Sequence, residues 1–158
     1  MKKILLLSLL FLAGWAFTAQ AIDLDKENRD PEYVESIVKR SQKIVDKLGI
    51  NDAKVAEDVR NVIANRYFTL NDIYEVRDAK VKEIKESGLT GDAKNNALKA
   101  AEDAKDAALY RIHFAFPAEL SLFLNEEQIE GVKDGMTYGV LEITYKSHLD
   151  MIPSLKED

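Results

Sequence analysis

Hydrophobic residues recur at spacings of three and four along most of the chain after Asp30, a pattern typical of amphipathic helices. Asp30 is a good N-cap residue, and Pro31 suits the first turn, where its missing N–H breaks no hydrogen bond. Gly49 closes this first run, and a second run continues to about Ser87. The pattern therefore predicts one helix up to Gly49 and a longer helix over residues 51–87.

The segment SGLTGD, residues 87–92, is the clearest turn in the chain, because two glycines stand among polar neighbours. A third helical pattern follows over 92–124, with alanine at many of its contact positions. Alanine lets a neighbouring backbone come close, as in a narrow antiparallel hairpin. Pro117 interrupts this pattern, but the apolar spacing resumes at Leu120, so we expect a kink there. The sequence predicts an all-α fold dominated by an antiparallel hairpin of residues 51–87 and 92–124.

A capping box begins the next predicted helix. In LNEEQ, residues 124–128, Asn125 can cap the helix and Gln128 can bond back to the N–H of Asn125. We expect this helix to run to about Asp134. The same segment is similar to the LTxxQ motif of small all-helical periplasmic chaperones, with Asn125 in place of threonine. A periplasmic helical chaperone or stress sensor is therefore an alternative function.

Gly131, Gly135 and Gly139 are spaced by four, which on one continuous helix would allow very close contact with a neighbour. Each glycine would cost that helix about 1 kcal/mol relative to alanine, however. We therefore expect Gly135 to cap the helix. An extended stretch with alternating apolar and polar residues should follow, and Thr144 should cap a last short helix.

The first 21 residues have the features of a cleavable export signal. They begin with MKK, continue with an apolar run over residues 4–17, and end in the small-x-small sequence AQA. The apolar run is shorter than the about 20 residues that a spanning helix needs. We expect cleavage after Ala21, a periplasmic or secreted protein without stable membrane insertion, and a flexible leader over 22–29.

Composition sets further limits on the mature protein. The chain has no cysteine, so packing alone must hold the fold together. The formal net charge is −6, and −8 without Lys2 and Lys3, which argues against nucleic acid or an anionic membrane as partner. We expect one helical domain over 30–158. Within it, SLKE at 154–157 offers a helix cap with no helix after it, which predicts a chain truncated at its C-terminus.

Three segments resemble a known group of proteins. They are DPEYVESIVKRSQKIVDKLGINDAKVAEDVRNVIANRY, YRIHFAF and EEQIEGVKDGMTYGVLEITYKSHLDMIPSL, and the most specific part is VKDGMTYG. Together they resemble domain-of-unknown-function family 3826, exported proteins of saccharolytic Gram-negative bacteria described as sugar-binding. The resemblance implies carbohydrate as a partner. Family members typically continue with another helix, which agrees with the expected truncation, whereas Pro117 departs from the family pattern.

Carbohydrate sites combine flat aromatic faces with convergent hydrogen-bonding side chains. The irregular stretch after the capping-box helix supplies both types within a few residues. The candidate ligand-binding residues are Asp134, Thr137, Tyr138, Glu142, Tyr145 and His148. Alternatively, the two tyrosines close the end of the hairpin and belong to the core.

Other residue groups give no convincing chemistry. Ser147, His148 and Asp150 have the composition of a catalytic triad, but neighbours in sequence do not point at one another. The paired acids Glu126 and Glu127 stand at a helix start, where they compensate the helix dipole. We expect no cofactor, no metal and no enzymatic activity. The expected function is an exported, non-enzymatic carbohydrate-binding module accessory to glycan processing.

Overall fold

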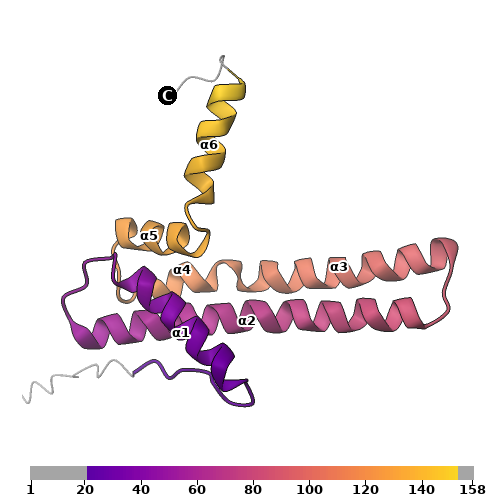
Figure 1. The fold of residues 1–158 in the computed structure, drawn as a ribbon, viewed down its shortest axis with the longest axis horizontal. Coiled ribbons are helices and arrows are strands. Elements are labelled where there is room, and N and C mark those ends of the chain that lie inside the picture. Colours follow the sequence, from indigo (N-terminus) through magenta and orange to yellow (C-terminus); the bar gives the residue numbers. More distant parts are fainter. Residues whose placement is uncertain (1–20, 153–158) are drawn as a thin grey trace, which may run out of the picture.

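The computed structural model describes residues 21–152, and every regular element in that range is a helix (Figure 1). The elements are α1 (Pro31–Val45), α2 (Ala53–Glu86), α3 (Gly91–His113), α4 (Ala115–Leu120), α5 (Glu126–Met136) and α6 (Val140–Met151). The all-α prediction is confirmed. Within the same range, no helix is both long and apolar enough to cross a membrane.

The helix starts follow local capping chemistry. The Asp30 side chain accepts a hydrogen bond from the Tyr33 amide, and Pro31 occupies the first turn of α1, as predicted. The cap of α2 is Asp52, one residue beyond the expected start at residue 51, and it accepts from the amides of Lys54 and Val55. Acidic acceptors at these positions satisfy amides that have no partner inside the helix.

The predicted hairpin is present, formed by α2 and α3, which run side by side (Figure 1). Gly88 and Gly91 make the turn with positive φ angles of 75° and 56°, a conformation that favours glycine. The interruption near Pro117 also occurs, but the break itself is at Phe114, between α3 and α4. Pro117 has no N–H to donate to the carbonyl four residues earlier, that of His113, so the helix is interrupted one turn before the proline.

The core lies at one end of the hairpin. There α1 crosses α2, and α4 and α5 complete the packing (Figure 1). The main cluster consists of Ile44, Val45, Val59, Val62, Ile63, Phe116, Leu120, Leu124 and Val132. A second cluster joins Ile37 of α1 to Ala64 and Phe68 of α2. The rest of the hairpin extends beyond α1 as a two-helix arm.

The glycine-rich segment differs from its prediction. α5 continues through Gly135 to Met136, so the expected cap at Gly135 is wrong. A Cβ on Gly135 would lie 2.9 Å from both Cγ1 and Cγ2 of Ile44, and one on Gly131 would lie 3.0 Å from Leu48 Cδ2. The two glycines therefore let α5 approach the end of α1 and the loop after it. The packing gained by this approach outweighs their low helix propensity.

The extended stretch and the cap at Thr144 are also wrong, because residues 140–151 form the continuous helix α6. The chain changes direction between α5 and α6 at Tyr138 and Gly139, whose φ angles are 57° and 68°. Leu141, Tyr145 and Leu149 are spaced by four in the sequence, so this segment fits a helical period as well as an alternating one.

The leader lies against α2 instead of extending freely from the helices. The Asp25 amide donates to Asn65 Oδ1, and Asn65 Nδ2 donates to the Asp23 carbonyl, each at 2.8 Å. Arg29 forms two hydrogen bonds with the Asp72 carboxylate, at 2.7 and 2.8 Å. The export signal before Ala21 and the cap expected at residue 154 lie outside the described residues.

Candidate functional site

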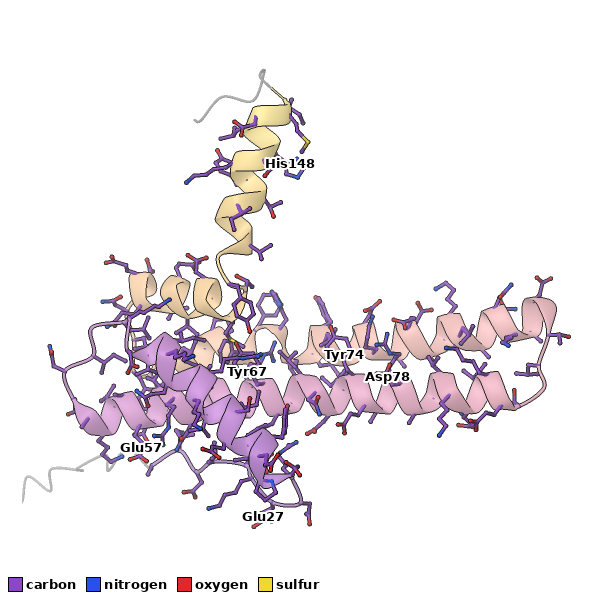
Figure 2. The ribbon with its side chains drawn as sticks, in the orientation of Figure 1. Glu27, Glu57, Tyr67, Tyr74, Asp78 and His148 are labelled. Carbon is purple, nitrogen blue, oxygen red and sulfur yellow. The ribbon has the colours of Figure 1, made fainter. Side chains whose placement is uncertain are left out.

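The six candidate residues are distributed over α5, α6 and the turn between them. Tyr145 and His148 lie on α6, which extends away from the other helices (Figures 1 and 2), and Glu142 is also on α6. Asp134 and Thr137 lie at the end of α5 and are exposed. Tyr138 lines a groove together with residues from another helix.

This groove lies between α1 and the turn that joins α5 to α6, and we call it the α1 groove. It is open and has a volume of about 520 Å³, and polar and apolar atoms contribute about equally to its surface. Its lining residues are Glu32, Glu35, Ser36, Lys39, Arg40, Lys43 and Tyr138. Six of the seven belong to α1 and recur every three or four residues, so they form one face of that helix. The sequence alone does not identify this face, because no local pattern shows which later segment lies beside it.

Arg40 is placed between two aromatic rings. Its guanidinium carbon lies 5.7 Å from the centre of the Tyr138 ring and 5.6 Å from that of Tyr67. Both distances fall within the range of cation–π attraction. Burial raises the pKa of the Tyr67 hydroxyl, and the positive charge of Arg40 opposes that shift. The Tyr138 ring, in contrast, is 68% exposed and therefore open to a ligand.

The turn that holds Tyr138 is built from backbone hydrogen bonds. The Gly139 amide donates to the Asp134 carbonyl at 2.9 Å, and the Thr137 amide donates to the Lys133 carbonyl at 3.1 Å. The Thr137 hydroxyl donates to the same Lys133 carbonyl. Asp134 and Thr137 thus help to shape the turn. Within it, Tyr138 is forced into the left-handed region, which is uncommon for residues other than glycine and tends to occur at functional sites.

Two of the charged side chains that line the α1 groove form an accessible ion pair. Lys39 forms a salt bridge with Glu35, and both side chains are mainly exposed. The hydrogen bond from Lys39 lowers the pKa of Glu35, so this carboxylate is ionised at neutral pH. The groove therefore offers donors and acceptors side by side, with an exposed aromatic ring at its edge.

The capping box is used within the fold. Asn125 accepts from the Gln128 amide at 2.9 Å, and Gln128 Oε1 accepts from the Asn125 amide at 3.2 Å. Gln128 Nε2 also donates to the Leu48 carbonyl at 2.9 Å, which ties α5 to the loop after α1. The LNEEQ segment therefore has a complete structural explanation, and its similarity to the LTxxQ motif carries little functional weight.

A second, apolar groove lies between α2 and α3 on the two-helix arm. Alanines 101, 104 and 108 of α3 form one wall, and Ile73 and Val76 contribute to the other. Val76 is 72% exposed, so apolar surface is open to solvent here.

No group of three or more His, Cys, Asp or Glu side chains within residues 21–152 is arranged to hold a metal ion. The Ser147 hydroxyl, a member of the triad considered from the sequence, donates to the Ile143 carbonyl one turn earlier in α6.

Together, these features define an all-α protein with a long helical hairpin and, beside its core, a groove of mixed polar and apolar surface with Tyr138 at its edge. The chain belongs to the family described as "Protein of unknown function (DUF3826)", which matches residues 34–158. The matched range includes most of the α1 groove, with Ser36, Arg40 and Tyr138 inside it. No curated protein matches the chain.

Proposed function

We propose that this protein is an exported, non-enzymatic carbohydrate-binding module accessory to glycan processing, and that the α1 groove is its binding site. The observation that carries the proposal is the position of Tyr138. Its ring is exposed in a left-handed turn and lies at the edge of a groove lined with hydrogen-bonding side chains. A flat ring beside donors and acceptors matches the two faces of a sugar, one of C–H groups and one of hydroxyls.

Each side of the α1 groove has a separate role in this proposal. Tyr138 stacks against the C–H face of a sugar ring, Arg40 donates to hydroxyl or ring oxygens, and Ser36 both donates and accepts. Glu32 and Glu35 accept from sugar hydroxyls. The open form of the groove suits part of a polymer chain better than an enclosed monosaccharide. Tyr145 and His148, on α6, take no part in this site.

A glycan array, followed by pull-down with plant polysaccharides, tests the proposal. The mature protein should retain a subset of glycans, and Tyr138→Ala should lose at least tenfold in affinity for them. Tyr110→Ala is the matched control, because Tyr110 is a similarly exposed tyrosine, at 72%, on α3. Equal loss in both variants, or no retained glycan at all, would contradict the proposal.

The chaperone alternative has one observation in its favour, the apolar groove of the two-helix arm. Under that alternative, unfolded segments would bind along Ile73 and Val76, and the α1 groove would be irrelevant. An aggregation-suppression assay with Val76→Glu separates the two functions. Suppression that disappears in Val76→Glu but survives in Tyr138→Ala would favour the chaperone.

A further inference from the structure

The backbone nitrogen of Ile22 lies 3.0 Å from Oδ1 of Asp58, a residue that is only 3% exposed. The other carboxylate oxygen accepts from Lys54 Nζ, also at 3.0 Å. The Lys54 side chain is 60% exposed, so solvent screens its charge and weakens its attraction to Asp58. Asp58 is therefore a buried carboxylate with one exposed cationic partner and one backbone N–H.

Ile22 is also the point at which the chain begins to pack. Its side chain contacts the main core cluster, whereas Ala21 is exposed. Its carbonyl accepts from Asn61 Nδ2 at 2.7 Å, and Asn61 Oδ1 accepts in turn from Arg60. These contacts fix the position of the Ile22 nitrogen relative to Asp58. The bond between Ala21 and Ile22 is the same bond at which the AQA sequence predicts cleavage of the export signal.

We propose that cleavage of this bond converts the Ile22 amide into an α-ammonium group that forms a buried ion pair with Asp58, so that removal of the export signal completes the fold. The proposal rests on the predicted export signal and is independent of carbohydrate binding. In this proposal, the Asp58 carboxylate is the ion-pair partner of the new N-terminus.

The chemistry is a hydrolysis catalysed by a signal peptidase. The C–N bond between Ala21 and Ile22 breaks, and water supplies a hydroxyl to the Ala21 carbonyl carbon and a proton to the Ile22 nitrogen. A second proton from solvent gives the ammonium, because α-amino groups have pKa values of about 7.7–8.0. Before cleavage Asp58 accepts one neutral N–H from Ile22. After cleavage it faces a charged group with three donors, which makes a shorter and stronger hydrogen bond.

Four proteins test the proposal. They begin either at Ile22 or at Ala21, each with Asp58 or with Asp58→Asn, and they are released from a fusion by a protease that leaves no added residue. The Ile22 protein should melt about 5 °C or more above the Ala21 protein. The difference should vanish in the Asp58→Asn pair. Equal melting of the first two proteins, or a difference that persists in Asp58→Asn, would overturn the proposal.

Reactivity of the α-amine gives a second readout that does not depend on the Asp58→Asn variant folding. Acetic anhydride at neutral pH should acetylate the Ile22 amine at least tenfold more slowly than the amine of the protein that begins at Ala21, as measured by peptide mass spectrometry. Lysine acetylation in the same samples serves as the internal control. Equal rates for the two α-amines would overturn the proposal.

Discussion

At the scale of single residues, the fold depends on side chains that are absent as much as on those present. Gly135 has no Cβ, and this absence lets α5 contact Ile44 of α1. Asp58 and Tyr138 are further examples: one is a carboxylate buried against the leader, and the other is a bulky residue in a left-handed turn. Each departs from the usual preference of its residue type, and each marks a contact that local sequence does not reveal.

Gly135→Ala should therefore destabilise the protein. A methyl group there would lie 2.9 Å from two carbons of Ile44, and overpacking of this kind costs about 1–3 kcal/mol. The gain in helix propensity returns roughly 1 kcal/mol, so a net loss of up to about 2 kcal/mol is expected in urea denaturation. Gly131→Ala should cost less, because it meets only the flexible end of Leu48. Stabilisation by Gly135→Ala would mean that α5 and α1 are not in close contact.

The ionised Asp58 carboxylate should make the free energy of unfolding sensitive to acid. Burial would raise its pKa, but hydrogen bonds from the Ile22 amide and from Lys54 outweigh burial and hold the pKa below its ordinary value. A group whose pKa is lower in the folded state stabilises fully above its unfolded pKa, and this stabilisation is lost as the pH falls through the folded pKa. Unfolding free energy measured from pH 6 to 2 should fall below about pH 4. In Asp58→Asn the fall should be shallower, and an unchanged slope would exclude this role for Asp58.

At the scale of helices, the sequence predicts α1 to α3 well because their signals are local. Asp30, Pro31 and the glycines of the 87–92 turn act on the backbone next to them. The region after Gly131 is harder to predict, because its structure depends on the contact of Gly135 with Ile44, which lies far away in the sequence. Helix propensity counted against glycine there, and tertiary packing reversed the balance.

The same distinction applies to the candidate site. Tyr138 could be selected from sequence as an aromatic residue beside glycine. Its partners Ser36 and Arg40 could not, since they lie on what reads as an ordinary solvated helix face. Conversely, Tyr145 and His148 were grouped with Tyr138 by proximity in sequence, and α6 carries them away from the groove (Figure 2).

Gln128→Ala tests how α5 is attached. The Gln128 side chain bonds both to the Asn125 amide and to the Leu48 carbonyl, so its removal should cost about 1–3 kcal/mol of unfolding free energy. Glu127→Gln is the control, because Glu127 is an exposed neighbour and the loss of its charge at the helix start should cost no more than about 1 kcal/mol. Thermal or urea denaturation measures both. Equal effects of the two changes would show that Gln128 does not tie α5 to the loop after α1.

At the scale of the whole molecule, stability should be unevenly distributed. The core is concentrated where α1, α4 and α5 meet α2, whereas the arm consists of two helices (Figure 1). Among described residues 69–113, Ile84 and Ala101 are the only buried hydrophobic residues. Regions with few buried apolar contacts open at low free energy. Beyond α1, the arm consists of α2 and α3 packed against each other, with no third described helix against them. The arm should therefore open at a lower free energy than the core.

Hydrogen exchange should reveal this gradient. Amides near Ile63 and Phe68 should exchange most slowly, and amides in the helical parts of the arm, residues 78–86 and 91–100, should exchange at least tenfold faster. Peptide-level mass spectrometry on the mature protein measures both regions in one experiment. Uniform protection along α2 would contradict the account, and would indicate that another surface covers the arm in solution.

The central claim is that the α1 groove binds carbohydrate through Tyr138. Its most direct test is an NMR titration of the isotope-labelled mature protein with the oligosaccharide selected by the glycan array. If the α1 groove binds the ligand, the backbone amide signals of Ser36, Arg40 and Tyr138 should shift with saturating dependence on ligand, while those of Tyr110 and His148 should not shift. Saturable shifts confined to α6 or to the two-helix arm, or no shifts at millimolar ligand, would contradict it.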